Sequence, residues 1–120
     1  MLATVGIALL LMVGIADAGI IFAGRYQAAT AADAAALAAA PVTFRPFGAS
    51  GDAVEEAARY ARINGASIIA CRCKTDPSWR ARTVEVIVER TVGLIGGGEV
   101  TVRARSTAEF DPLALLEEAD

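Results

Sequence analysis

Two cysteines separated by one residue, Cys71 and Cys73, are the side chains in this sequence best suited to redox or metal chemistry. On a β-strand they would point to the same face of the sheet. A disulfide across so short a separation would strain the geometry that such a bond needs, and two thiolates supply at most half of a tetrahedral zinc site. The sequence therefore favours a pair of half-buried free thiols, with an intermolecular disulfide or a redox role as alternatives.

Other patterns that could support catalysis are weak. The chain contains no histidine, the commonest general base and metal ligand near neutral pH, so its serines have no such base to activate them. The three glycines at residues 96–98 lack the Lys and Ser or Thr of a phosphate-binding loop, and Glu99 after them would repel phosphate. We therefore expect a turn at these glycines and a protein without enzyme activity, cofactor, metal or small-molecule substrate.

One acidic side chain lies in strongly apolar surroundings. Asp17 interrupts the apolar run of residues 2–24 about two-thirds of the way along it. A carboxylate near the middle of a bilayer costs roughly 2.5–3.5 kcal/mol on insertion scales, and Arg25 would be about 12 Å away along a helix. We therefore expect Asp17 to find a cation or a hydrogen-bond donor on another subunit. The alternative is a carboxylate that reaches the membrane interface or stays protonated.

The element that carries Asp17 is predicted to be one long helix over residues 1–40. Residues 2–24 are long enough to span a bilayer core, which needs about 20 apolar residues. Residues 25–40 are rich in alanine, which has the highest helix propensity, and Pro41 is expected to end the helix. At about 1.5 Å per residue such a helix is close to 60 Å long, so its second half would project beyond the lipid.

Small residues along this helix favour packing against other helices. Gly14 and Ala18 are four residues apart, and Gly19 follows them. Small residues at this spacing let helices approach closely in lipid. The alanines after the apolar run would present a smooth surface to neighbouring subunits, or would form a plain stiff stalk.

An apolar N-terminal run can be a retained anchor or a cleaved signal peptide. Residues 16–18 have the A-x-A pattern of a cleavage site, but no Lys or Arg precedes the run, and its apolar character continues past that site. A retained single-pass anchor is therefore the main prediction. The alternatives are a secreted small binding domain that lacks residues 1–18, and a small membrane-bound thiol or metal protein that uses Cys71 and Cys73. A single nearby cation, Arg25, is too weak a signal to set the orientation in the membrane.

The remaining residues predict a small α+β head. Residues 41–51 contain two prolines and two glycines and are expected to form a loop. A helix is predicted over residues 52–64, with Asp52 as its N-cap. Three stretches of alternating apolar and polar residues predict an antiparallel sheet, so that one helix lies on three strands within a head of residues 52–110. The strands are expected at residues 67–73, 82–91 and 99–108, and an acidic tail at residues 111–120.

Two segments among the first forty residues resemble a known family. One is Asp17-Ala18-Gly19, late in the apolar run. The other is QAATAADAAALAAA, from Gln27 to Ala40, which contains Asp33 and Leu37. In these segments the chain resembles TadE/TadG-like proteins, the minor pilin-like components of tight-adherence (Flp) pili and related secretion machinery.

This resemblance implies a pilin-like fold and a non-catalytic role as a minor subunit or assembly factor. The protein would lie in the cell membrane as a single-pass protein with its head outside the cytoplasm, and Asp17 would be the family's intramembrane acidic residue. Its partners would be membrane lipid, other pilin-like subunits and secretion-system components. The net charge of −3 and the mixed charge pattern imply no nucleic acid partner.

Overall fold

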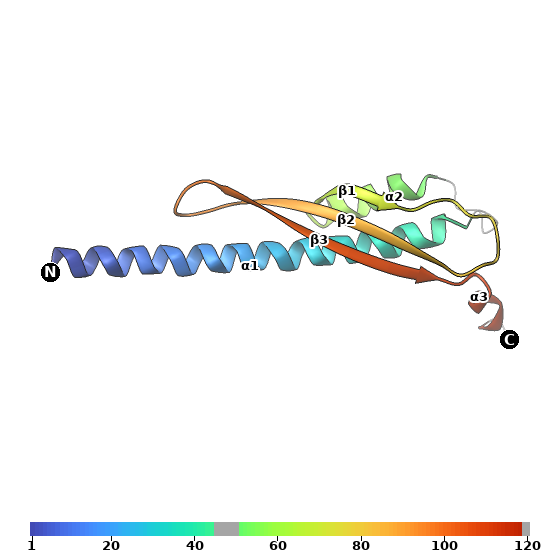
Figure 1. The fold of residues 1–120 in the computed structure, drawn as a ribbon, viewed down its shortest axis with the longest axis horizontal. Coiled ribbons are helices and arrows are strands. Elements are labelled where there is room, and N and C mark those ends of the chain that lie inside the picture. Colours follow the sequence, from blue (N-terminus) through green and yellow to red (C-terminus); the bar gives the residue numbers. More distant parts are fainter. Residues whose placement is uncertain (45–50, 119–120) are drawn as a thin grey trace.

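The structure, a computed structural model, describes residues 1–44 and 51–118. Its first element is a helix of 41 residues, α1 (Leu2–Val42), which runs along almost the whole length of the molecule (Figure 1). The predicted long helix is confirmed, but its predicted end is wrong, because Pro41 lies within the last turn. The turn continues past the proline since Thr43 N–H donates to Ala40 O and Phe44 N–H donates to Pro41 O. Residues 45–50, most of the predicted loop, lie outside the described residues.

The head follows the predicted α+β order. α2 (Ala53–Ile63) begins after Asp52, whose side chain accepts a hydrogen bond from Val54 N–H at 3.2 Å. Three strands form one antiparallel sheet in the order β1-β2-β3. The last two strands extend two residues beyond their predicted ends. The bounds are β1 (Ser67–Arg72), β2 (Arg82–Gly93) and β3 (Glu99–Phe110), followed by one short helical turn, α3 (Ala114–Glu117).

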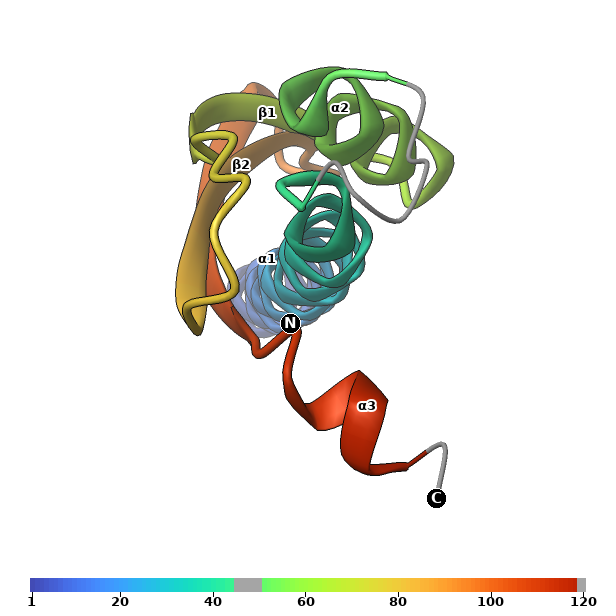
Figure 2. The same cartoon turned by 90° about the vertical axis from the view of Figure 1, so that its right-hand side faces the viewer.

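The core of the head is built on the second half of α1. Viewed from the end of the molecule in Figure 2, the sheet covers one side of α1 and α2 lies over an adjacent side. From the strands, the core receives the valines that the alternating pattern predicted to share one face, Val84, Val86 and Val88. From α1 it receives alanines that are 3% exposed or less: Ala28, Ala31, Ala32, Ala35, Ala36, Ala39 and Ala40.

This core corrects the expectation that the alanine-rich half of α1 is a bare stalk or faces other subunits. The chain itself covers that surface, because a helix with alanine on several sides can accept a sheet on one side and a second helix on another at close range. The alanine pattern could not predict which side of α1 is covered, since alanines occur all around the helix.

The first third of α1 has no such cover. Every residue from 1 to 12 is exposed, including Leu9, Leu10 and Met12. Among the described residues, α1 is the one helix long and apolar enough to cross a membrane, although a signal sequence would meet the same criterion. The molecule is 73 Å long as a result, with the head at one end and an apolar rod at the other.

Arg82 links several segments at the end of the head that lies far from the N-terminus. Its guanidinium donates hydrogen bonds to the carbonyls of Thr43, Asp76 and Ser78, and it lies over the ring of Phe44 at 5.4 Å from the centroid. The strand β2 is thereby attached to the last turn of α1.

Candidate functional site

The β2–β3 hairpin reaches from the base of the head to the apolar half of α1. Its two strands of 12 residues pair continuously from Arg82 opposite Phe110 to Gly93 opposite Glu99. The turn between them, residues 94–98, is called the hairpin tip below. Gly97 and Gly98 have φ angles of +108° and +82°, which glycine adopts without the steric cost that a side chain would add.

Asp17 of α1 binds the hairpin tip. Its Oδ1 accepts a hydrogen bond from Ile95 N–H at 2.7 Å, and its Oδ2 accepts one from Gly96 N–H at 3.0 Å. We call these two hydrogen bonds the tip contact. The expectation that Asp17 finds its partner on another subunit is therefore corrected, because two backbone donors from the same chain occupy its carboxylate. The expectation that it faces protein is confirmed.

At Gly96 the absence of a side chain leaves room for the tip contact. A Cβ atom at this position would lie 2.8 Å from Asp17 Oδ2 and 3.2 Å from Val13 Cγ1. Gly24 of α1 allows a second close approach between the helix and the hairpin, because a Cβ there would lie 2.8 Å from Val92 Cγ1. Both glycines let the backbone of the hairpin run close to α1.

The small residues predicted as a helix-packing surface lie away from the tip contact. Gly14, Ala18 and Gly19 are exposed, and among the described residues no neighbouring heavy atom lies within 4 Å of a Cβ built on either glycine. Asp17 differs from them, because it is half-buried at the tip contact. The predicted assembly residues therefore divide into one that binds the hairpin and three that remain open.

Asp33 provides a second attachment of α1 to the same hairpin. Its carboxylate accepts a hydrogen bond from the Ser106 hydroxyl of β3. The other two residues of the family-like segment, Gln27 and Leu37, are exposed, and Leu37 keeps 67% of its surface accessible. Asp17 and Asp33, the two acidic residues of the family-like segments, thus share a role that the sequence did not reveal. Each attaches α1 to the hairpin at a different position along its length.

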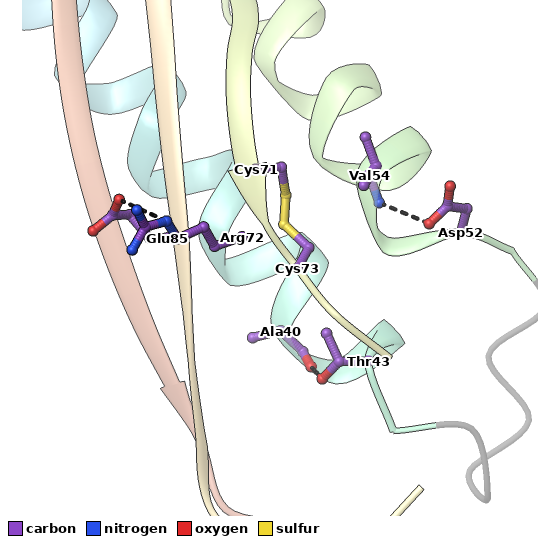
Figure 3. Close-up of a disulfide and its surroundings, with 8 residues drawn as sticks. All are labelled: Ala40, Thr43, Asp52, Val54, Cys71, Arg72, Cys73 and Glu85. Carbon is purple, nitrogen blue, oxygen red and sulfur yellow. Dashed lines mark hydrogen bonds and ion pairs between the residues drawn. A yellow bond between two sulfur atoms is a disulfide. The ribbon is translucent and has the colours of Figure 1, made fainter. Parts of the chain in front are cut away.

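The two cysteines form an intramolecular disulfide between Cys71 and Cys73 (Figure 3). The expectation of free thiols is wrong. β1 ends at Arg72, so Cys73 lies just outside the strand, and its Cα is 5.3 Å from that of Cys71. This separation is within the roughly 4.4–6.8 Å that disulfides use. Cys71 is half-buried and Cys73 is buried.

Alkylation tests this disulfide directly. The unfolded, unreduced chain should take up no iodoacetamide, and the reduced chain should take up two equivalents, as measured by intact mass. Because the bond closes a very short loop, its reduction should lower the free energy of unfolding by only about 1–2 kcal/mol. The double variant Cys71→Ser/Cys73→Ser is the control for stability, and alkylation without reductant would contradict the assignment.

The electrostatics of the head include one acidic group with a lowered pKa. Hydrogen bonds from the side chain and backbone of Ser78, together with the positive charges of Arg82 and Arg80, lower the pKa of Asp76 below its ordinary value of 3.8. A carboxyl with a lowered folded-state pKa stabilises the fold above the unfolded pKa and loses this contribution as pH falls through the folded value. Asp76 is only half-buried, so solvent screens its charge and the effect on stability is small.

The disulfide and the tip contact are both connections within the chain. Both sulfur atoms are bonded to each other, and Asp17 is occupied by backbone donors. In residues 1–44 and 51–118, no group of three His, Cys, Asp or Glu side chains lies close enough together to hold a metal ion. The arrangement serves to attach a hairpin to an apolar helix.

Comparisons with family models, with curated proteins and with solved structures gave no match. The role of this chain is therefore inferred from its own geometry, in which an uncovered apolar helix is joined rigidly to a small α+β head.

Proposed function

We propose that the protein is a single-pass, pilin-like membrane protein of the TadE/TadG-like kind, with α1 as its anchor and the head outside the cytoplasm. The observation that carries this proposal is the uninterrupted exposure of residues 1–12 on an apolar helix. An exposed apolar surface of this kind marks a site of contact with lipid or protein. The protein would act as a minor subunit or assembly factor and would perform no catalysis.

The tip contact favours a retained anchor over a cleaved signal peptide. Cleavage after Ala18 would remove Asp17 and would leave Ile95 N–H and Gly96 N–H without their acceptor. A secreted binding domain without residues 1–18 would therefore lose a contact that the rest of its fold is shaped to make, including the close approach at Gly96.

The open face at Gly14, Ala18 and Gly19 supports assembly with other helices. These residues are uncovered, and small residues four apart permit close helix contacts in lipid. Because the hairpin tip contacts Asp17 and Val13 and leaves these three residues exposed, a neighbouring helix could pack here without displacing it. The partner would be another pilin-like subunit or a membrane component of a secretion system.

Membrane fractionation and thiol crosslinking test the proposal. The intact chain should remain in the membrane after alkaline extraction, with an intact mass that includes residues 1–18. A cysteine at Gly14 should form crosslinks to a neighbouring helix in the membrane, whereas the matched variant Val13→Cys, on the hairpin side, should not. A soluble product of lower mass would instead identify the secreted domain, and equal crosslinking of the two variants would remove the assigned assembly face.

A further inference from the structure

We infer that the hairpin tip, residues 94–98, is a second membrane-contacting element, which enters the lipid interface beside α1. This inference rests on the proposed membrane anchor and specifies where the membrane surface crosses the molecule. It follows from the level at which the hairpin lies along α1, from the hydrogen bonding of the tip and from the position of the nearest charges.

The first argument is the depth of the helix. Gly93, at the end of β2, lines the same surface hollow as Ile20 of α1. The helix from Leu2 to Ile20 is about 28 Å long, close to the roughly 30 Å of a bilayer's hydrocarbon core. The hairpin tip extends beyond this level toward the N-terminus, since Gly96 lies against Asp17 and Val13. A bilayer that covers the exposed part of α1 therefore also reaches the tip.

The second argument is that the tip is chemically suited to this environment. Residues 94–98 are Leu-Ile-Gly-Gly-Gly, without a charge, and Ile95 keeps 66% of its surface exposed. Isolated large apolar side chains on a surface are common, but Ile95 is joined through its backbone N–H to Asp17 of the apolar helix. The lipid-contacting surface proposed for α1 therefore continues onto the hairpin tip.

The third argument is the hydrogen bonding of the turn. Backbone polar groups in contact with lipid require partners within the protein. Leu94 N–H donates to Gly98 O at 3.0 Å, and Gly97 N–H donates to Leu94 O at 3.3 Å. The N–H groups of Ile95 and Gly96 are not used by these two bonds. Each of them donates a hydrogen bond to the Asp17 carboxylate. The carboxylate in the apolar run therefore has a physical purpose, because it lets an irregular turn lie at the edge of the lipid.

The nearest charges limit the depth of insertion. Glu99, paired in register with Gly93, is exposed and would remain at the headgroup level. On the helix, Arg25 is the first charge after Asp17. Further along the hairpin, Arg103 pairs with Glu89 at 3.8 Å, within a polar region that would lie in water. The tip alone, and not the strands, would contact lipid.

The experiment uses the whole oxidised protein in vesicles of phosphatidylcholine and phosphatidylglycerol. Because both native cysteines are bonded to each other, a single added cysteine can carry an environment-sensitive dye. The three positions are L10C on the helix, I95C at the tip and T83C near the base of the hairpin, where Thr83 is also exposed. Lipids that carry a nitroxide near the headgroup or near the end of the acyl chain report the depth of each dye.

The expected result is that the nitroxide near the headgroup quenches the dye at I95C, that the deeper nitroxide quenches the dye at L10C, and that neither quenches the dye at T83C. Adding D17A should reduce the quenching at I95C and leave that at L10C unchanged. If L10C is quenched while I95C behaves like T83C, the tip does not contact lipid and this inference fails alone. If L10C is not quenched, the proposed anchor fails as well.

Discussion

Replacing Asp17 with alanine is expected to raise the hydrogen-exchange rates of the Ile95 and Gly96 amides by about 10- to 100-fold. Hydrogen bonds to a charged acceptor contribute about 1.5–3 kcal/mol, and the substitution removes the acceptor of both amides. Exchange measured by NMR or mass spectrometry in detergent micelles would report this effect. The strands should keep their protection, since the ladder from Arg82 to Gly93 does not involve Asp17.

Two further variants separate the tip contact from a general effect of charge. Glu99→Ala removes an exposed carboxylate close to the same turn and should leave the exchange of both amides unchanged. Asp17→Asn keeps one carbonyl oxygen as an acceptor and should give an intermediate rate. If Asp17→Ala and Glu99→Ala have the same effect, the carboxylate of Asp17 does not hold the tip.

Replacing Ala35 with leucine is expected to destabilise the head by about 1–3 kcal/mol, or more where the backbone cannot shift. Ala35 is fully buried in the core that α1 shares with the sheet and α2, so three added carbons must displace packed neighbours. For a domain of this size, each 1 kcal/mol lowers the melting temperature by about 4–8 °C. Thermal unfolding followed by circular dichroism in detergent is the measurement.

Ala29→Leu is the matched control, because Ala29 is on the same helix but exposed. Leucine and alanine have similar helix propensities, so this variant should unfold within about 0.5 kcal/mol of the parent. Equal melting temperatures for the two leucine variants would show that the alanine-rich half of α1 is not the core of the head.

The elements of the fold could be predicted because local patterns determine them. Asp52 caps α2, and Gly65, with a φ angle of +80°, follows its end. Alternation in β2 places Val84, Val86 and Val88 on one buried face. Each of these signals lies within a few residues of the structure that it specifies, so sequence patterns alone indicated one helix and three antiparallel strands after the long helix.

The contacts that join the elements could not be predicted in the same way. Asp17 and Ile95 are far apart in the sequence, and their contact depends on the length of the hairpin relative to the helix. The disulfide depends on β1 ending one residue before Cys73. The buried side of the alanine-rich segment depends on where the sheet is placed, which alanines on all sides of a helix leave undetermined.

The continuity of α1 has a mechanical consequence. The same helix is the apolar rod and the centre of the head, and the hairpin is fixed to it at Asp17, at Asp33 and, through Arg82, at Thr43. The apolar rod and the head are therefore expected to move as one rigid body. Because a helix close to 60 Å long transmits any change in its inclination, a rotation of about 10° in the bilayer would swing the far end of the head by about 10 Å.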